Sequence, residues 1–306
     1  MRGKRHLQLL VFAAALICLP GLGGVWILYA AHPLPDSQLI AETGSVQRGR
    51  QVFVVSHCAS CHASAGQSDR LRLGGGLALA SNFGTFRVPN ISPDPEAGIG
   101  RWRARDLANA LLRGVSPAGT HYYPVLPYTS YTHMTPGDVS DLMAYLRTLP
   151  AVASRPPPHE LAFPFNIRRL VGLWKWLYFK PGPLTPDTGH SELWRRGRYL
   201  VEAQSHCAEC HSARNVFGAI RSSSRYGGGR DPEGVGFVPN ITAAGIGRWS
   251  AAQWIHFFAT GTTPDLRIVG STMADVLTDT SMLSQGDQQA MAAYLMSLAP
   301  RETSSP

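Results

Sequence analysis

Hydrophobic positions recur at helical spacing in two well-separated parts of the chain. The stretches 135–150 and 284–300 each place Leu, Met or Ala and Tyr on one face of a helix, behind Thr135 and Ser284 respectively. Threonine and serine are favourable N-cap residues, so both stretches predict a helix that begins at a defined position. The pattern predicts an all-α protein with matching helices in its two halves.

The first 31 residues follow a different pattern. Three basic side chains among the first five residues precede an uncharged segment of 25 residues, 7–31. As a helix this segment would be roughly 37 Å long, enough to cross a hydrocarbon core of ~30 Å. A cleaved signal peptide is the alternative, but its apolar region usually has only about 7–15 residues. We expect residues 1–6 to be a cytoplasmic basic end and 7–31 an uncleaved transmembrane anchor, with the rest of the chain on the periplasmic side of the inner membrane.

The two halves of the chain repeat the same motifs in the same order. Self-similarity of this kind indicates two copies of one module, which we expect at 45–150 (the first repeat) and 191–300 (the second repeat), followed by a tail at 301–306. The shared motifs are "RGR" (48–50 and 196–198), "SHCASCHA" with "SHCAECHS" (56–63 and 205–212), "GGG" (74–76 and 227–229), "VPNIS" with "VPNIT" (88–92 and 238–242) and "GIGRW" (98–102 and 245–249).

Between the repeats, residues 151–190 form a linker rich in proline and aromatic residues. "RPPPHE" predicts an extended segment, whereas 163–182 predicts a short amphipathic helix that carries Trp174, Trp176 and Tyr178. We expect this helix to pack across the two repeats. A docking surface for a partner and contact with the lipid interface are the alternatives.

Composition and charge exclude two broad classes. Of 306 residues, 44% are apolar and 16% charged, which indicates a folded protein with a sizeable core rather than a disordered one. The formal charge of +8 is often a sign of nucleic-acid binding. No run of Lys and Arg occurs beyond the first five residues and no nucleic-acid motif accompanies the charge, so we expect no nucleic-acid partner.

Four of the five cysteines belong to two C-x-x-C-H motifs, and Cys18 lies in the apolar N-terminal segment. In a C-x-x-C-H motif two thiols add to the vinyl groups of one haem and the histidine becomes the proximal iron ligand. A split zinc site would leave the histidines unexplained, and a thioredoxin-like dithiol belongs to a βαβ context. We therefore predict two covalent c-type haems, held by Cys58, Cys61 and His62 and by Cys207, Cys210 and His211.

The sixth iron ligand of the second haem is predicted by a spacing that both repeats share. Twelve residues separate the tryptophan of "GIGRW" from a glycine in each repeat, and twelve more lead to Met273 in the second repeat and Leu126 in the first. Met273 lies in an irregular segment before the last helix, where class I cytochromes c place their distal methionine. We predict that Met273 binds the second iron.

The first haem needs a different ligand, because leucine cannot bind iron. His121 lies in the same loop as Leu126, and we predict that it binds the first iron. Met134, His133 and an open position are the alternatives. Met134 directly precedes the N-cap Thr135, as a leucine precedes Ser284, so it is expected to act as a hydrophobic staple.

Other residues are expected to support the haems. A proximal histidine usually donates its second ring N–H to a carbonyl, for which Pro89 and Pro239 are the candidates, 27 and 28 residues after the two histidines. Of the remaining candidates, Asn90 and Asn240 would hold this loop, and Arg101 and Arg248 would pair with haem propionates.

These motifs resemble those of bacterial multihaem cytochrome c subunits of membrane-bound periplasmic dehydrogenases, of the alcohol, gluconate and sorbitol type. The resemblance rests on C-x-x-C-H, "VPNI(S/T)…GIGRW", "YPVLPYTSYTHMT", "GSTMADVL" and "AYLRTLP", and covers most of 45–300. It implies electron transfer from a catalytic flavoprotein or quinoprotein to ubiquinone or a terminal oxidase. The family's methionine positions correspond to Met273 and Leu126, and its members typically carry three haem motifs where this chain has two.

The predicted protein is therefore all-α, with two tandem class I cytochrome c domains joined by the linker and an N-terminal transmembrane helix. We expect a membrane-anchored periplasmic dihaem cytochrome c that takes electrons from a dehydrogenase and passes them to an oxidase, a quinone or another cytochrome. A His/Met second haem would have a higher potential than a His/His first haem, so electrons would enter at the first and leave at the second. A dihaem peroxidase with an open first haem and a relay subunit of a terminal oxidase are the alternatives.

Overall fold

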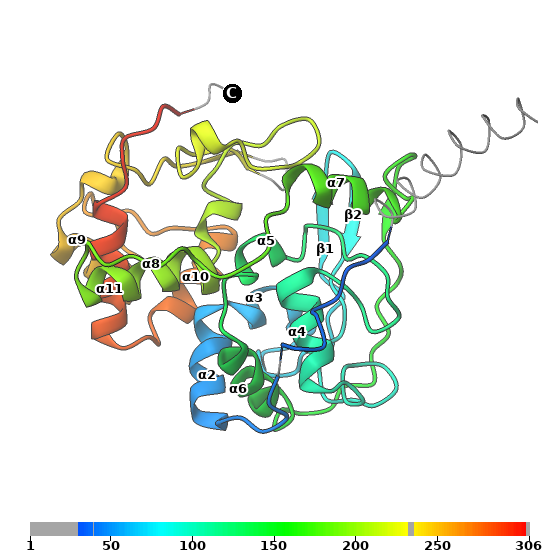
Figure 1. Ribbon diagram of the computed structural model, residues 1–306. Helices are drawn as coiled ribbons and strands as arrows, with labels where there is room; N and C mark the ends of the chain where they lie inside the picture. The colour runs from blue at the N-terminus through cyan, green and yellow to red at the C-terminus, as the bar shows by residue number, and fades with distance from the viewer. Residues whose placement is uncertain (1–29, 39, 232–235, 304–306) are drawn as a thin grey trace, which may run out of the picture.

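Two groups of helices, one from each repeat, form the main regular structure of the protein (Figure 1). The structure is a computed structural model and describes residues 30–38, 40–231 and 236–303. The first repeat contains α2 (Val46–Val55), α3 (Cys58–His62), α4 (Ala104–Arg113), α5 (Tyr128–Tyr131) and α6 (Pro136–Leu146). The second contains α8 (Glu192–Tyr199), η1 (Leu200–Gln204), η2 (Cys207–Glu209), η3 (Ser222–Ser224), η4 (Ile246–Arg248), α9 (Ala251–Thr260), α10 (Thr272–Thr280) and α11 (Gln285–Met296).

In each repeat the first and last long helices cross at a glycine. Helix α2 packs on α6 at Gly49, and α8 packs on α11 at Gly197; these are the central residues of the two "RGR" motifs. A Cβ atom on Gly49 would lie 1.9 Å from the Asp141 carbonyl oxygen, and one on Gly197 would lie 1.8 Å from that of Ala290. Only glycine allows two backbones to approach so closely, so helix packing accounts for the repeated motif.

The closing helices begin where the sequence predicts. Thr135 Oγ1 accepts a hydrogen bond from the Asp138 backbone N–H at 3.1 Å, and Ser284 Oγ accepts one from Asp287 at 3.1 Å. Each bond satisfies a donor that has no partner within the helix. The predicted N-caps are confirmed.

Each repeat has its own hydrophobic core. Phe53, Leu107 and Leu146 are buried in the first core, and Leu200, Trp254 and Leu295 in the second. The cores also exchange a few residues. Ala203 of the second repeat is buried in the first core, and Val55 of the first repeat is buried in the second. The two repeats are therefore packed against each other and are not held together by the linker alone.

The expected all-α fold is wrong, because short strands occur in both repeats. A hairpin of β1 (Ala78–Ser81) and β2 (Gly84–Arg87) is extended by β3 (Glu160–Leu161) from the linker, and β4 (Gly229–Arg230) pairs with β5 (Phe237–Val238). All the pairs are antiparallel. Strands of two to four residues are too short for the period-two alternation that identifies a strand in a sequence. Their pairing depends on neighbours brought together by the fold.

The expected N-terminal transmembrane helix is not supported either. Its residues, 7–31, lie almost wholly outside the described part of the chain, which begins at residue 30. Among the described residues, no helix combines the length and the apolar character needed to span a bilayer.

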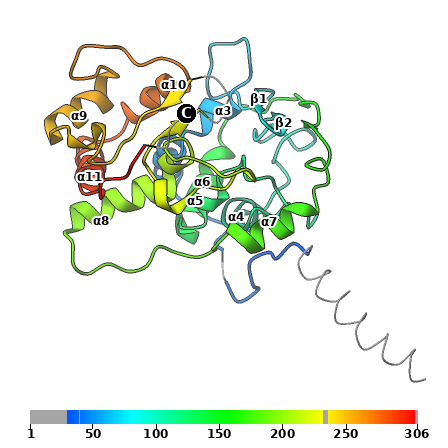
Figure 2. The same ribbon diagram turned by 90° about the horizontal axis from the view of Figure 1, so that it is seen from above.

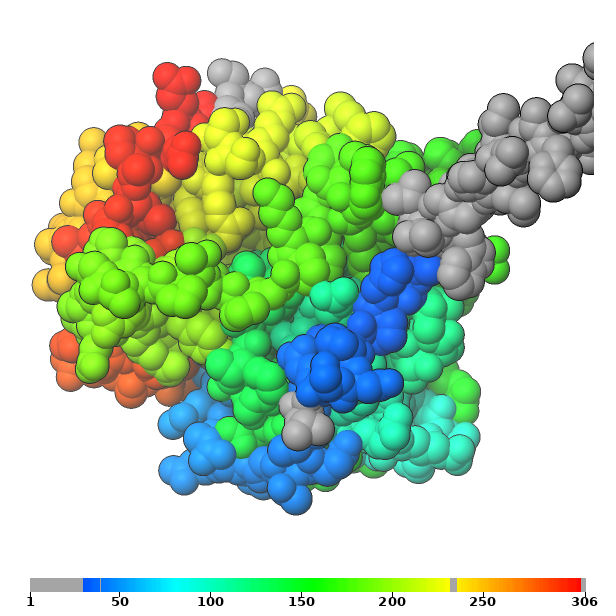
Figure 3. Space-filling view, in the orientation of Figure 1, coloured from blue at the N-terminus to red at the C-terminus, as the bar shows by residue number. Residues whose placement is uncertain are grey.

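The linker helix contacts both repeats. The helix expected within 163–182 is α7 (Leu170–Tyr178), and Lys175 Nζ donates to the Gly114 carbonyl oxygen at the end of α4, at 2.7 Å. On its other side, Trp174 Nε1 donates to the Phe217 carbonyl oxygen of the second repeat at 2.9 Å. After α7 the linker crosses the face of the molecule towards α8, as the green atoms show in Figure 3.

Candidate haem-binding sites

Each C-x-x-C-H motif begins directly after a histidine in the left-handed backbone conformation. His57 has a φ of 52° and precedes α3, which begins at Cys58. His206 has a φ of 44° and precedes η2, which begins at Cys207. The same sharp turn therefore starts both motifs and places their two cysteines and histidine on about one helical turn, as attachment to one porphyrin requires.

The four cysteines of the two motifs form no disulfide. Cys58 and Cys207 are partly buried, whereas Cys61 and Cys210 are exposed, and no disulfide links any of them. In the part of the chain that the structure describes, no three His, Cys, Asp or Glu side chains gather in a way that could hold a metal ion. This arrangement does not fit a zinc site and leaves each pair of thiols available for a haem.

Burial raises the pKa of Cys207 to about 12 and also raises the pKa of Cys58. It therefore favours the protonated form of the two partly buried thiols.

The proximal histidines are held as the sequence predicts. His62 Nδ1 lies 2.9 Å from the Pro89 carbonyl oxygen, and His211 Nδ1 lies 2.9 Å from that of Pro239. A carbonyl accepts only from an N–H, so Nδ1 carries the proton and Nε2 keeps its lone pair for iron. Burial lowers the pKa of both histidines, which favours the neutral, ligating form. The chemistry of the donor set fits a c-type haem in each repeat.

Two polar loops fix the carbonyls that orient these histidines. The Asn90 side-chain amide donates to the Val152 carbonyl oxygen at 2.6 Å and to that of Ser154 at 2.9 Å. In the second repeat, the Asn240 amide donates to the Arg301 carbonyl oxygen at 2.8 Å. Each asparagine thus ties its proline loop to the chain after the last helix of its own repeat, which is the role that the sequence predicts.

The "GGG" motifs contribute a contact that the sequence did not suggest. The Gly75 N–H donates to the His62 carbonyl oxygen at 2.9 Å, and the Gly228 N–H donates to that of His211 at 3.0 Å. Both glycines have positive φ, of 67° and 74°. The backbone of each proximal histidine is therefore held by a glycine turn, in addition to the bond from its ring.

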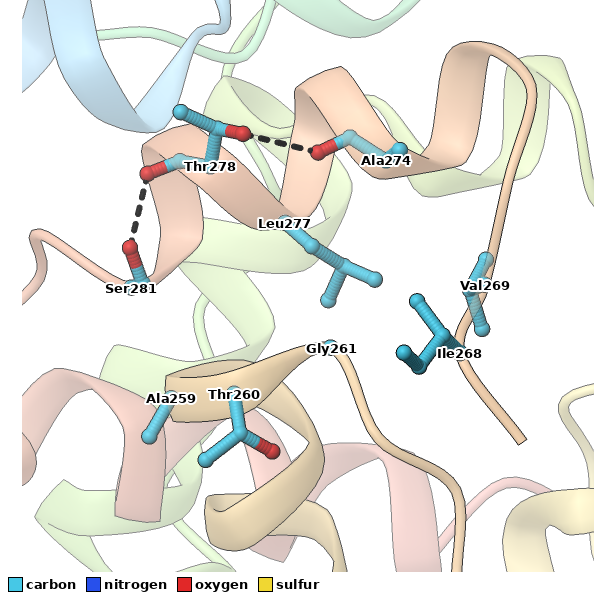
Figure 4. Close-up of a pocket in the computed structure, with 9 residues that line it drawn as sticks. All are labelled: Ala259, Thr260, Gly261, Ile268, Val269, Ala274, Leu277, Thr278 and Ser281. Carbon is cyan, nitrogen blue, oxygen red and sulfur yellow. Dashed lines mark hydrogen bonds between the residues drawn. The ribbon is translucent and has the colours of Figure 1, made fainter. Parts of the chain in front are cut away.

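Met273 lies in the first turn of α10, so the irregular segment expected around it is wrong. Its side chain is partly buried against the second core. Beside this helix a cavity of about 300 Å³ opens between the end of α9 and α10. Figure 4 shows Ile268, Val269 and Leu277 converging on it around Gly261. The segment that carries Met273 therefore borders a hollow rather than close-packed chain.

The two repeats share the backbone geometry that leads to this segment. Gly114 and Gly261 cap α4 and α9 in the left-handed conformation, and their carbonyl oxygens accept from the N–H groups of Tyr122 and Val269. The number of positions between the glycine and the residue that donates to it is the same in both repeats. Further along the chain, Tyr128 packs on Gly114 and Leu277 packs on Gly261. The interval from the glycine to the packing residue is two positions longer in the second repeat than in the first. The correspondence of Leu126 with Met273 falls within this last interval and stays a prediction.

The three candidate ligands of the first haem lie in different surroundings. His121 is buried, pairs with Val115 as an isolated bridge, and accepts a hydrogen bond at its carbonyl oxygen from Arg168. His133 Nδ1 lies 2.6 Å from the Gly182 carbonyl oxygen of the linker, and burial lowers its pKa. Met134 is 3% exposed and is buried in the first core together with residues of α6, as the staple interpretation requires.

The two candidate propionate partners are both on the surface. Arg101 is exposed and forms an ion pair with Glu96, and Arg248 is exposed in η4. Their pairing with propionates stays a prediction.

The two haem motifs meet across the interface between the repeats, which the sequence did not predict. The rings of His57 and His206 lie 6.0 Å apart between centroids, at 87° to each other. On one side Asp279 of α10 accepts from Ser60, inside the first motif, at 3.1 Å. On the other side, Thr129 of α5 donates to Glu209, inside the second motif. The views in Figures 1 and 2 both place α10 beside α3.

Of the four side chains that meet at this interface, the sequence singles out only the two histidines. Serine and histidine precede both C-x-x-C-H motifs, which marks His57 and His206 but gives no reason for them. Asp279 and Glu209 are only 2% and 8% exposed, and nothing in the sequence distinguishes them from surface carboxylates.

Comparison with known proteins places these sites in a family. The family model for cytochrome c matches residues 46–150. A dihaem cytochrome c-type protein of Cereibacter sphaeroides is 47% identical over 290 residues, which span 92% of this chain and 95% of the relative. This chain belongs to the dihaem cytochrome c family. The dihaem cytochrome accordingly carries two covalently bound c-type haems.

Two further relatives are longer than this chain. The fructose dehydrogenase cytochrome subunit of Gluconobacter japonicus is 34% identical to the dihaem cytochrome over 279 residues, 90% of this chain and 57% of the relative. The cytochrome c subunit of the quinone alcohol dehydrogenase of Gluconacetobacter polyoxogenes is 32% identical over 273 residues, 85% of this chain and 57% of the relative. The dihaem cytochrome thus spans little more than half the length of these two subunits.

Proposed function

We propose that the dihaem cytochrome is the electron-transfer subunit of a dehydrogenase complex and passes single electrons from a catalytic flavoprotein or quinoprotein to the respiratory chain. When bound, each haem supplies one-electron chemistry through the Fe(III)/Fe(II) couple. The observation that carries the proposal is the direct contact of the two haem motifs through His57 and His206. The dehydrogenase subunits among the relatives support this class of partner.

Residues around the two sites orient the proximal histidines and place carboxyl groups near the haem motifs. The Pro89 and Pro239 carbonyls fix the orientation and the tautomer of the proximal imidazoles. Asp279 and Glu209 place a buried carboxyl group beside each motif, where a negative charge favours the oxidised haem. Such surroundings allow two haems of similar attachment to have different potentials.

The test of the function follows electrons from a substrate to the haems. The tagged cytochrome is purified from its native membranes, its partners are identified by mass spectrometry, and sugar, alcohol and sugar-acid substrates are added to the complex. Reduction of both haems by one of these substrates, dependent on a copurified flavoprotein or quinoprotein, is the expected result. Copurification with an oxidase core alone, and no haem reduction by any substrate, would contradict the proposal.

The axial ligands determine the direction of transfer. We assign Met273 to the second iron and His121 to the first, which makes the second haem the one of higher potential and the point where electrons leave. Low-temperature EPR with near-infrared spectroscopy distinguishes His/Met, bis-His and open haems. We expect His121→Ala to remove the bis-His signal, while Met273→Leu removes the methionine charge-transfer band. Equal potentials in a redox titration would contradict the direction.

The charge pattern of the N-terminal sequence supports a periplasmic location for the two haem domains. Basic residues precede an uncharged segment in the sequence, and this order favours a body on the periplasmic side of the inner membrane. Fractionation with protease protection of intact spheroplasts tests the location. Degradation of the haem domains by external protease is expected, and complete protection would contradict it.

One observation favours a second function, small-molecule chemistry at an open first haem. Leu126, which the spacing of the repeats aligns with Met273, is an aliphatic side chain packed against the first core and cannot bind iron. Carbon monoxide binding to one haem of the reduced, as-isolated protein would support this function. The absence of binding would leave electron transfer as the function of both haems.

A further inference from the structure

The residues that precede the two haem motifs form one aromatic contact. His57 is 4% exposed and His206 is partly buried, and their rings meet edge to face. Tyr131 packs on the other side of His206, with 5.4 Å between the ring centroids, and its hydroxyl donates to the Ser56 carbonyl oxygen at 3.1 Å. The two imidazoles are therefore held by neighbours on both sides of the interface.

The backbone at these positions indicates that the histidine side chains are needed. Both residues have a left-handed conformation, which glycine adopts without a steric penalty and other residues adopt with one. The same departure occurs independently in the two repeats, and in both the side chain points to its counterpart. A strained conformation that persists at equivalent positions suggests a function for the side chain.

Other contacts fix the distance between the two rings. Ser205 Oγ donates to the Val55 carbonyl oxygen at 3.1 Å. Ser205 directly precedes His206, and Val55 lies two residues before His57. Ser60 Oγ, inside the first motif, donates to Asp279 Oδ2 at 3.1 Å, and Thr129 Oγ1 donates to Glu209, inside the second motif. Since these bonds join the repeats on several sides of the ring contact, the histidines are not free to separate independently.

We propose that electrons pass between the two haems through the ring contact of His57 and His206. The proposal rests on the proposed electron-transfer function. His57 is bonded to Cys58, and His206 to Cys207, so each ring is one peptide unit from a thioether attachment of its own haem. The path between the two sulfur atoms then contains one through-space step, between packed rings.

The step is a simple exchange of one electron. With both haems bound, the donor iron would be oxidised from Fe(II) to Fe(III) and the acceptor iron would be reduced from Fe(III) to Fe(II). No bond is formed or broken, no proton moves, and neither imidazole is oxidised or reduced. The competing route would be direct transfer between the two haem groups, without passage through either histidine.

The experiment measures electron exchange within half-reduced holoprotein. Two-dimensional NMR exchange spectroscopy links haem methyl signals of the oxidised and reduced forms, and dilution separates exchange within one molecule from exchange between molecules. The variants are His57→Asn with His206→Asn, since asparagine tolerates the left-handed conformation but has no ring. We expect loss of the concentration-independent exchange in the double Asn variant and its retention in His206→Phe, which keeps a ring.

A matched control distinguishes the loss of the electron path through the rings from a weakened contact between the two repeats. Arg70→Gln removes an ion pair with Asp279 at the same interface but leaves both rings in place, and we expect it to exchange electrons at the wild-type rate. Wild-type exchange in the double Asn variant would overturn the proposal in favour of direct transfer. An equal loss of exchange in Arg70→Gln would also overturn the proposal, because it would show that exchange depends on how the two repeats pack and not on the rings. A wild-type protein without two haems by pyridine haemochrome analysis would instead contradict the proposed function.

Discussion

Asp279, in the second repeat, accepts a hydrogen bond from Ser60, inside the first haem-attachment motif, at 3.1 Å. The same carboxylate pairs with Arg70 at 2.9 Å and lies 3.6 Å from His57 Nδ1, and it is 2% exposed. The helix that carries Met273 therefore ends in a charged contact with the other haem site. A single short helix, α10, therefore carries both Met273 and the carboxylate that contacts the first motif.

Replacing Asp279 by Asn is expected to destabilise the protein and to raise the potential of the first haem. The variant loses the ion pair with Arg70, and we expect the free energy of unfolding to fall by about 1–3 kcal/mol. Removal of a buried negative charge near the first motif favours the reduced haem. Denaturant unfolding and redox titration measure the two effects. The control is Asp265→Asn, an exposed ion pair with Arg267, for which we expect less than about 1 kcal/mol and no shift in potential.

Replacing Gly49 or Gly197 by Ala is expected to separate the crossing helices of one repeat. The new Cβ would collide with a backbone carbonyl oxygen at 1.9 or 1.8 Å, so we expect a loss of about 3 kcal/mol or more and a lower haem content. Gly137→Ala and Gly286→Ala are matched controls, because their nearest neighbours are hydroxyl oxygens at 3.8 and 3.9 Å. Thermal unfolding that is equally affected in all four variants would disprove the packing argument.

Replacing Asn90 or Asn240 by Ala gives a matched pair of perturbations. Each side-chain amide holds the proline loop whose carbonyl orients one proximal histidine. We expect each variant to lose about 1–3 kcal/mol and to shift the potential of the haem in its own repeat only. A shift of both potentials in either variant would show that the loops do not act locally. Redox titration monitored by EPR assigns each shift to its haem.

Acidification is expected to destabilise the interface through His206. Burial and, to a smaller extent, the neighbouring His57 lower the pKa of His206 to about 4, against the opposing effects of Glu209 and the Ser56 carbonyl. Above the ordinary pKa of about 6.5, both the folded and the unfolded forms are neutral. Between about 6.5 and 4 the unfolded chain binds a proton that the folded one excludes, so the stability falls as the pH falls, by on the order of 3 kcal/mol in total.

The measurement is the free energy of unfolding as a function of pH. His206→Gln is expected to flatten the curve between pH 6.5 and 4. His256→Gln is the control, because His256 is exposed on α9. A curve that is as steep in His206→Gln as in the wild type would assign the acid sensitivity to other groups.

Much of each haem site was predictable because its chemistry is local. The C-x-x-C-H spacing places two sulfurs and an imidazole on one turn, and the repeat of "VPNI" after each histidine led to the Pro89 and Pro239 carbonyls. The N-caps Thr135 and Ser284 were predictable for the same reason, since a cap depends on residues three positions away. The strands were missed, because β3 contributes two linker residues whose pairing with β2 depends on the fold.

The sequence by itself determined that this protein has two similar modules, each with a covalent haem site, since helix periodicity and attachment spacing are properties of neighbouring residues. Only the tertiary structure decided that His57 meets His206 and that Asp279 reaches the first motif. Ser205 and Val55, which bond beside this contact, are 150 residues apart. Which residues meet over such a separation is set by the shape and the buried surface of two folded modules, and no short pattern along the chain records it.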